Sequence, residues 1–257
     1  MDIGRPRHFP LGTAVQTNYV GNVADIQGVL FDFSGTLCRL EFGSGVLDGL
    51  MDDAGAPLEI TDQVELMRRL TAPVGISEGL PPELHEAWHR RDLDTEVHHT
   101  VYTAALRAAG LPDAAAEVVY RRMCDGENWT PYPDVLPALR AVRDAGLKSA
   151  VVSNIGWDIR PVLAQHGIAD LVDEIVMSYV EGHVKPEPEI FAAACERLGV
   201  EPARALMVGD SEEADGGAAA LDCSVAIVDP LPTAERPDAL LSALSAYGIS
   251  QTHSFRG

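Results

Sequence analysis

Four apolar runs of strand length recur in the second half of the sequence, and each ends in small or acidic residues. They are KSAVVSN (148–154), EIVMS (174–178), ALMVGD (205–210) and SVAIVD (224–229). Segments of helical period fall between them, at residues 157–167, which end in Gly167, and at residues 188–199. Strands that alternate with helices in this way predict a parallel sheet of the α/β class.

The run VLFD (29–32) predicts the first strand of this sheet, although residues 33–147 separate it from the next one. That separation is far longer than a usual crossover between parallel strands. Within it, helix-period segments such as PPELHEAWHRRDLDTEV are frequent and no strand is clear. We therefore predict an all-helical cap inserted into a discontinuous Rossmann-like core, with WTPYPDV as the return hinge. The boundaries that we expect are residues 45–130 for the cap and residues 26–44 and 131–257 for the core.

The ends of the predicted strands carry residues that could perform chemistry. In an open parallel sheet the ligand crevice lies at the carboxyl ends of the strands, so residues that follow different strands meet there. The residues at these positions are Asp32, Ser153, Asn154, Lys185, Asp210 and Asp215. Converging carboxylates repel one another unless a cation lies between them, and Mg²⁺ prefers one or two carboxylates together with phosphate oxygens and water. An aspartate beside such an ion can attack phosphorus and form an aspartyl-phosphate.

The ordered set FDFSGTL, VVSN, VKPEP and VGDSEEAD resembles the four motifs of the haloacid dehalogenase-like hydrolase superfamily, across residues 27–230. Each motif is short, but all four occur in order and each stands at a predicted strand end. The helical segment after the first strand is similar to the subclass I cap of that family. The resemblance implies that Asp32 is the nucleophile and that Lys185 stabilises it. It further implies Mg²⁺ ligands at Asp32, Asp210, Asp215 and the backbone carbonyl of Ser34, and phosphoryl contacts from Thr36, Ser153, Asn154 and Lys185.

Position 34 departs from the usual phosphatase pattern of the family, which has a second aspartate where this chain has Ser34. In the family that aspartate protonates the departing oxygen and later activates water, and a serine hydroxyl does neither well. Loss of a positioned acid–base group costs about 10²–10⁴ in rate. Because the family uses the backbone at this position to bind the metal, the resemblance implies that the metal site is retained.

Three functions are compatible with this serine, and we favour a Mg²⁺-dependent phosphatase or phosphotransferase that acts on a small phosphorylated metabolite. An aryl or acyl phosphate would suit it, because such a leaving group needs little protonation. The second function is a 2-haloacid dehalogenase-type C–X hydrolase. Those relatives also lack the second aspartate, but they need no Mg²⁺ and typically lack an acid where Asp210 stands. The third is a catalytically weak protein that binds a phosphorylated ligand.

Charge and composition limit the partners and the compartment. The chain has 39 acidic and 19 basic residues, a formal net charge of −20, which argues against nucleic acid or an anionic membrane as a partner. No stretch reaches the roughly 18 apolar residues of a membrane span. The four cysteines form no C-x-x-C pair, which favours a reduced, cytoplasmic compartment. Residues 1–25 lack the apolar region of a signal peptide and are expected to form a flexible or loosely docked extension. The sequence indicates no oligomeric state.

Several cap residues have a pattern that could suggest another function. Residues 85–89 spell H-E-x-x-H, which is typical of zinc peptidases, but the third ligand of the extended motif is missing and we interpret the segment as a solvated helix face. Trp88 and Trp129 are expected to be packing or hinge anchors. We interpret the other polar candidates as ordinary surface residues rather than substrate contacts: Arg90, Arg91, His98, His99 and, near the crevice, His183.

Overall fold

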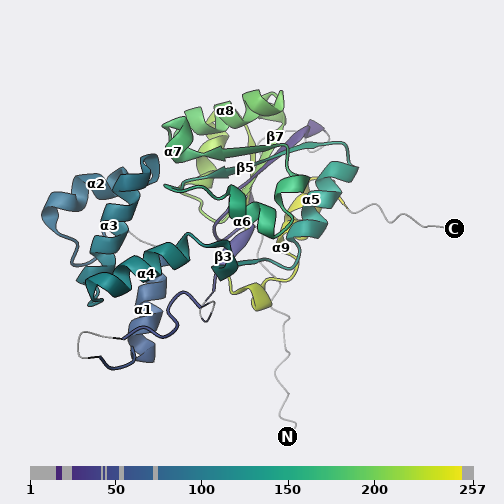
Figure 1. The fold of residues 1–257 in the computed structure, drawn as a ribbon. Helices are drawn as coiled ribbons and strands as arrows, with labels where there is room; N and C mark the ends of the chain where they lie inside the picture. Colours follow the sequence, from purple (N-terminus) through teal and green to yellow (C-terminus); the bar gives the residue numbers. More distant parts are fainter. Residues whose placement is uncertain are drawn as a thin grey trace, which may run out of the picture.

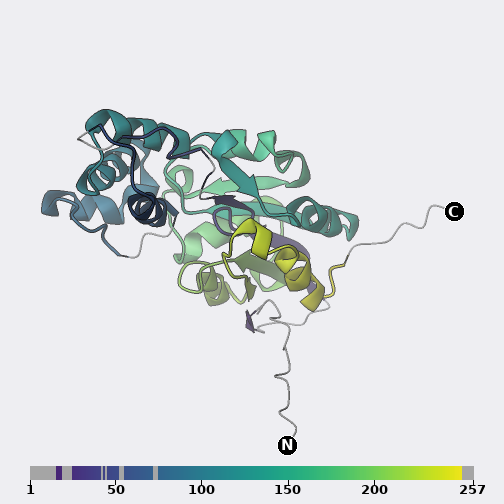
Figure 2. The same cartoon turned by 90° about the horizontal axis from the view of Figure 1, so that it is seen from below.

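In a computed structural model of the chain, a six-stranded sheet carries helices on both faces and a separate group of helices lies beside it (Figures 1 and 2). The structure describes residues 16–18, 25–41, 43, 45–51, 55–71 and 75–250. The strand order is β1-β8-β7-β2-β5-β6. The bounds of these strands are β1 Gln16–Asn18, β2 Gly28–Phe31, β5 Lys148–Ser153, β6 Glu174–Met177, β7 Ala205–Gly209 and β8 Ser224–Ile227.

The centre of the sheet is parallel, which confirms the predicted α/β class. Strand β2 pairs in parallel with β5 on one side and with β7 on the other, although a long insertion separates it from β5 in the chain. The pairs β5–β6 and β7–β8 are parallel as well. All residues of β2 are buried, as expected of a strand covered on both faces. The carboxyl ends of the five parallel strands therefore meet at one edge.

Helices cover the two faces of the sheet because alternate side chains of a strand point in opposite directions. Val29 and Phe31 belong to one hydrophobic core, which includes side chains of the helices α5, α6 and α9. Leu30, between them, belongs to a second core with α8 on the other face (Figure 1). These helices and the short α7 have the bounds α5 Val135–Asp144, α6 Arg160–Gln165, α7 Ser178–Glu181, α8 Pro188–Leu198 and α9 Ala239–Ala246.

The two core helices predicted from the sequence both form, one of them shorter than expected. Helix α8 matches its predicted range, with a proline in its first turn and Gly199 in the left-handed conformation at its end. Helix α6 is shorter than the predicted 157–167. The chain turns just before it, where the Asp158 carboxylate accepts a hydrogen bond from the backbone N–H of Arg160, and Pro161 suits the first helical turn.

Strand β1 was not predicted. It lies in the segment 1–25 that we expected to be a loosely docked extension, and it pairs antiparallel with β8 at the edge of the sheet. The prediction is therefore wrong for residues 16–18, while residues 1–15 and 19–24 lie outside the described part of the chain. The three residues, Gln-Thr-Asn, have no apolar alternation that could have predicted a strand.

A group of helices lies on the left in Figure 1, and in the chain these helices come between β3 and β4, the two strands of a small second sheet. Its helices are α1 Ile60–Thr71, α2 His85–His89, α3 Thr95–Ala108 and α4 Asp113–Met123. Asp94 begins α3, because its Oδ1 accepts hydrogen bonds from the backbone N–H groups of Glu96 (2.8 Å) and Val97 (2.9 Å).

The fold is thus a Rossmann-like core with a helical cap, as predicted, and the cap boundaries at residues 45 and 130 remain a prediction. None of the described helices combines the length and apolar character needed to cross a bilayer.

The small sheet connects the cap helices to the core. Its strands β3 (Cys38–Leu40) and β4 (Trp129–Pro131) pair antiparallel. The sequence predicted a hinge at 129–135 and no clear strand within residues 45–130. Strand β4 corrects that expectation, because it begins at Trp129 and crosses the predicted boundary at residue 130. Strands of three residues are too short to show an alternating pattern, and this pair is specified by contact between distant segments.

Candidate active site

A cavity of about 260 Å³ lies between the carboxyl edge of the sheet and the cap helices. Of the site residues predicted from the sequence, all except Thr36 line it: Asp32, Ser34, Ser153, Asn154, Lys185, Asp210 and Asp215. The cap contributes the opposite wall, with Leu70, Thr71, Arg91, Asp92, His98, Tyr102 and Met123. The chain positions of these residues span much of the sequence, so the cavity exists only in the folded protein.

Asp32 and Lys185 form a buried ion pair at the floor of this cavity. The Nζ atom of Lys185 lies 2.6 Å from Oδ1 of Asp32 and 2.6 Å from Oδ1 of Asp215. Burial raises the pKa of Asp32 to about 6, and the charge of Lys185 limits that rise. Burial by itself would lower the pKa of Lys185, but the carboxylates of Asp215 and Asp32 outweigh it and raise that pKa, so the ammonium stays charged.

Asn154 holds Lys185 in place from the neighbouring strand end. Its Nδ2 donates to the backbone carbonyl of Lys185 (2.9 Å), and its Oδ1 accepts from the backbone N–H of the same residue (2.7 Å). The side-chain amide that we expected to contact a phosphoryl group therefore binds the Lys185 backbone. Ser153, buried at the end of β5, lines the cavity as expected.

Asp210 and Asp215 bring two further carboxylates to the site. Asp215 is fully buried at the start of a 3-10 helix, η7 (Asp215–Leu221), and its Oδ2 accepts a hydrogen bond of 2.9 Å from the backbone N–H of Ser211. Burial raises the pKa of Asp210 to about 8, and the negative charges of Asp32 and Asp215 add to that rise. Asp210 is therefore the carboxyl group that benefits most from a cation.

The carboxylates fit a divalent cation. Asp32, Asp210 and Asp215 each offer one oxygen atom within 4.8 Å of the others. When all are ionised, the three carboxylates and the Lys185 ammonium carry a combined charge of −2. A hard divalent ion would cancel that charge, and a site with only oxygen donors suits Mg²⁺ better than a softer metal.

Two glycines allow these carboxylates to approach the backbone. Gly35 has φ +81°, and a Cβ atom there would lie 2.3 Å from Oδ2 of Asp210. A Cβ atom at Gly209 would lie 2.1 Å from Oδ2 of Asp215. Neither distance is possible between non-bonded atoms, so both positions require glycine for the carboxylate cluster to form.

Thr36 does not take the predicted position. It is fully buried, it does not line the cavity, and its Oγ1 has no hydrogen-bond partner among the residues that the structure describes. The loop that carries it is held instead by Arg236, a fully buried residue that the sequence did not indicate. Its guanidinium donates from Nη1 to the carbonyl of Gly35 (2.6 Å) and from Nη2 to the carbonyl of Thr36. The same group lies 3.1 Å above the ring of Tyr132.

His98 corrects another expectation, because it is buried rather than at the surface. It is only 2 % exposed, its Nδ1 lies 2.9 Å from the hydroxyl of Tyr120, and its ring stacks on Tyr102 with 4.3 Å between centroids. Burial lowers the pKa of His98 to about 3, so the imidazole is neutral. A Cβ atom at Gly156, on the core, would come within 2.5 Å of His98, so the cap packs closely against the core here.

The H-E-x-x-H segment and the cap tryptophans have structural contacts. Nε2 of His85 lies 3.0 Å from the carbonyl of Leu80, and neither His85 nor His89 belongs to a group that could hold a metal within the described residues. Trp88 is packed inside the cap, as expected. Trp129, at the hinge, packs on Phe33 with ring centroids 4.7 Å apart and also lines the cavity.

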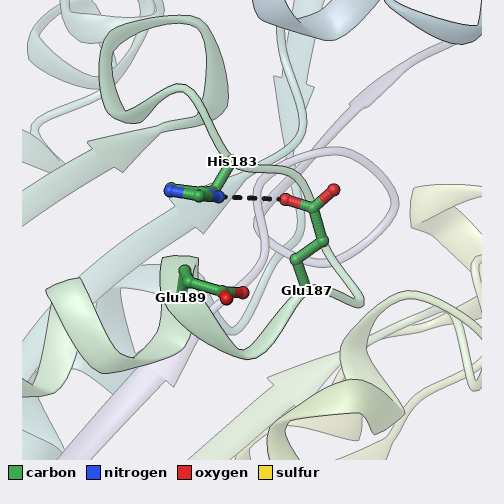
Figure 3. Close-up of side chains that lie close together, drawn as sticks. All are labelled: His183, Glu187 and Glu189. Carbon is green, nitrogen blue, oxygen red and sulfur yellow. Dashed lines mark hydrogen bonds and ion pairs between the residues drawn. The ribbon is translucent and has the colours of Figure 1, made fainter.

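His183 lies outside the cavity, close to the start of α8. Its Nδ1 is 3.2 Å from Oε2 of Glu187, and Figure 3 shows the two side chains facing each other with Glu189 nearby. One ligand atom from each of the three lies within 4.8 Å of the others, but all three residues are exposed. The Glu187 carboxylate also accepts from the backbone N–H of Val184, so it stabilises this turn.

A family model described as haloacid dehalogenase-like hydrolase matches residues 26–221. The chain belongs to the haloacid dehalogenase-like hydrolases. This confirms the resemblance inferred from the four motifs, and it identifies the protein as a hydrolase. Family membership fixes the fold more securely than the reaction, because one fold supports several chemistries.

Three known proteins illustrate the range of this family. The glyceraldehyde 3-phosphate phosphatase of Methanopyrus kandleri is 35% identical over 59% of this chain and 70% of its own. The plasmid phosphoglycolate phosphatase of Cupriavidus necator is 30% identical over 78% of this chain and 88% of its own. The structure of L-2-haloacid dehalogenase from Xanthobacter autotrophicus with chloropropionic acid covalently bound has a TM-score of 0.58 and 26% identity, over 88% of this chain and 85% of that one.

Proposed function

We propose that this hydrolase is a Mg²⁺-dependent phosphatase that acts on a small phosphorylated metabolite and uses Asp32 as its nucleophile. The observation that carries the proposal is the position of the Asp32 carboxylate, 2.6 Å from Lys185 and within 4.8 Å of Asp210 and Asp215. The similarity to two phosphatases supports it. A cavity of about 260 Å³ suits a substrate of a few carbon atoms beside the phosphoryl group.

Each residue of the floor then has a chemical role. Lys185 keeps Asp32 ionised and orients it, and one carboxylate oxygen of Asp32 attacks phosphorus to form an aspartyl-phosphate. The Lys185 ammonium and the Ser153 hydroxyl hold the phosphoryl oxygens as negative charge develops on them. Mg²⁺, held by Asp32, Asp210, Asp215 and the carbonyl of Ser34, would supply charge neutralisation for the transferring group.

Because Ser34 protonates a leaving group poorly, the expected rate of hydrolysis depends on how much protonation the leaving group needs. Since the serine lines the cavity where the family's phosphatases carry an acid, an aryl or acyl phosphate should react more readily than an alkyl phosphate. The substitution Ser34→Asp is expected to increase kcat toward alkyl phosphates more than toward aryl phosphates. An equal or lower kcat toward both classes would mean that Ser34 is not simply a missing acid.

A dehalogenase is the second candidate, because the chain resembles L-2-haloacid dehalogenase in fold and lacks an acid at position 34. The cluster of Asp32, Asp210 and Asp215 argues for the phosphatase. Such a cluster is costly in a low-dielectric site unless a cation is bound there, and C–X hydrolysis by an aspartate has no need of that cation.

The decisive experiment measures phosphate release from a panel of phosphorylated metabolites and from p-nitrophenyl phosphate, with Mg²⁺ and after chelation. We expect turnover only with Mg²⁺, and none in Asp32→Asn. Mass spectrometry of acid-quenched protein should detect a phosphoryl group on Asp32. Metal-independent release of chloride from 2-chloropropionate would overturn the proposal in favour of the dehalogenase. Ligand binding without turnover would favour the phospho-ligand-binding protein.

A further inference from the structure

The cavity contains a second set of titratable residues that the proposed chemistry does not yet use. On its floor, Asp32, Lys185 and Asp215 are bonded to one another, and Asp210 belongs to the same carboxylate cluster. On the cap wall, the titratable or charged residues are Arg91, Asp92, His98 and Tyr102. With a serine at position 34, a proton for an alkyl leaving group has to come from this wall or from water.

Three of these four residues are poor proton donors at neutral pH. Arg91 does not give up its proton in proteins, and its guanidinium is engaged with the carbonyl (2.9 Å) and the ring (4.8 Å) of Trp88. The imidazole of His98 is not protonated at neutral pH, since its pKa is about 3. Burial raises the pKa of Tyr102 to about 12, so that its phenol is a weak acid.

Asp92 differs from them. It lies in a short 3-10 helix, η3 (Arg91–Leu93), that links α2 to α3, and its side chain is only 16% exposed. Burial raises the pKa of Asp92, while the positive charges of Arg91 (Nε to Oδ2, 3.6 Å) and Lys185 oppose the rise. A carboxyl group in such surroundings can hold a proton and also release it, which is the property required of a general acid.

The fold also fixes where Asp92 lies. Its backbone carbonyl accepts a hydrogen bond from Oγ of Ser178, at the start of α7 in the core. The same Oγ accepts from the backbone N–H of Ile155 (2.9 Å), on the loop that follows Ser153 and Asn154. The cap, the start of core helix α7 and the loop after Ser153 are thus tied together, and Asp92 is held in the wall opposite the floor that carries Asp32.

We propose that Asp92 is the general acid and base of this enzyme, supplied by the cap in place of the residue that position 34 lacks. The inference rests on the proposed phosphatase function. It extends that function to alkyl phosphates, whose leaving alkoxide must be protonated. The gain in alkyl activity from Ser34→Asp should then be smaller in the wild-type background, where Asp92 already supplies an acid, than in Asp92→Asn.

The two half-reactions balance with this assignment. In the first, Asp32 attacks phosphorus, the bond between phosphorus and the ester oxygen breaks, and the Asp92 proton passes to that oxygen, which leaves as an alcohol. In the second, the Asp92 carboxylate takes a proton from water while the water oxygen attacks phosphorus. The bond between phosphorus and Asp32 then breaks, which releases hydrogen phosphate and restores both residues.

The test compares two substrates in the full chain: phosphoglycolate, or the alkyl phosphate that the wild type hydrolyses fastest, and p-nitrophenyl phosphate, whose leaving group needs no proton. In Asp92→Asn we expect the single-turnover rate of leaving-group release, which reports the first half-reaction alone, to fall by about 10²–10⁴ for the alkyl phosphate and to change little for the aryl phosphate. The matched control is Glu86→Gln, which changes an exposed cap carboxylate in α2 and should leave both values unchanged.

Two further measurements separate proton transfer from structure. The double variant Asp92→Asn with Ser34→Asp should regain alkyl phosphatase activity, because it returns an acid to the family's usual position. The wild-type alkyl rate should also decline at high pH as Asp92 loses its proton, a decline that is absent in Asp92→Asn. The charged and titratable groups that face Asp92, namely Arg91, Lys185, His98 and Tyr102, are unchanged in that variant.

Several outcomes would overturn the assignment. Equal losses in the single-turnover rate of leaving-group release from both substrates would make Asp92 a structural residue, and no loss on either would leave it without a role. A selective loss of alkyl activity in Tyr102→Phe but not in Asp92→Asn would move the acid to Tyr102. Failure of the proposed function gives a different pattern, in which the wild type hydrolyses neither phosphate ester or Asp32→Asn remains active, and the Asp92 assignment then falls with it.

Discussion

The buried Lys185 ammonium should be the largest single electrostatic contribution to the stability of the core. Its side chain is 3 % exposed and it lies 2.6 Å from a carboxylate oxygen of Asp32 and of Asp215. The substitution Lys185→Met keeps most of the volume of the side chain and removes the charge. Two buried carboxylates then face each other without the cation that separates them.

The size of the effect follows from these distances. At 2.6 Å each ion pair is worth roughly 6 kcal/mol in gross Coulomb energy with an effective dielectric constant of 20. Desolvation offsets much of that, and removing one partner of a buried pair costs about 3–5 kcal/mol in practice. We therefore expect Lys185→Met to lower the free energy of unfolding by about 3–5 kcal/mol at pH 8.

The loss should be smaller at low pH. The pKa of Asp32 in the folded protein is already raised from 3.8 to about 6 with Lys185 present, and it rises further without it. A carboxyl with a raised folded-state pKa favours folding below its unfolded pKa, and that contribution is lost as the pH rises through the folded value. At pH 5 Asp32 can bind a proton instead of remaining charged, so the variant should recover part of its stability there.

The assay is urea unfolding of metal-free protein at pH 5 and pH 8, followed by fluorescence of Trp88, Trp129 and Trp157, which are all buried. The matched control is Lys148→Met, which removes the other lysine of the chain. That residue is 56% exposed in its 2.9 Å ion pair with Asp173, so its loss should cost less than about 1 kcal/mol.

A double-mutant cycle provides the sharpest check. Lys185→Met combined with Asp215→Asn removes both signs of charge, so the double variant should be less destabilised than the sum of the single variants. A loss below about 1 kcal/mol at both pH values, or simple additivity, would show that the ammonium does not stabilise the carboxylates as described.

Three other substitutions test the same site. Gly35→Ala places a Cβ atom against the Asp210 carboxylate and should abolish Mg²⁺ binding in calorimetry, whereas Gly146→Ala, also at positive φ but with open space around it, should retain that binding. Arg236→Met leaves the buried carbonyls of Gly35 and Thr36 without their donor; we expect a loss of about 3 kcal/mol in urea unfolding, and a loss near zero would refute the proposed anchoring. Mg²⁺ should raise the Tm more at pH 8.5 than at pH 6, because Asp210, with a pKa of about 8, must lose its proton to bind the ion; Asp210→Asn should remove this difference, and its persistence would exclude Asp210 as the ligand.

Most of the cavity floor could be predicted because parallel strands impose it. Apolar runs predict the strands, and because ligands bind at the carboxyl ends of parallel strands, Asp32, Ser153 and Asp210 are expected at the same edge of the sheet. The four motifs then placed Lys185 and Asp215 at the same edge. The roles of these residues remain predictions for the experiments above.

The residues that were misjudged depend on contacts between distant segments. Thr36 follows Asp32 closely in the chain, but it does not line the cavity, and its carbonyl is bound by Arg236, two hundred positions away. His98 lies on a helix whose periodicity does not reveal which face meets the core, and the close approach of Gly156 buries it. Strand β1 forms by backbone pairing with β8, and its polar sequence has no pattern that predicts a strand.

The sequence by itself determined the family, the segments that form the parallel strands and the carboxylate-rich edge, because hydrophobic periodicity and short motifs are local properties of the chain. The tertiary structure alone decided what faces that edge. The docking of η3 on α7 brings Asp92 to the cavity, and it depends on a hydrogen bond between residues 86 positions apart in the chain. Such a contact depends on burial and shape in the folded protein. The sequence alone therefore could not predict that Asp92 is the cap residue that brings a carboxyl group to the cavity.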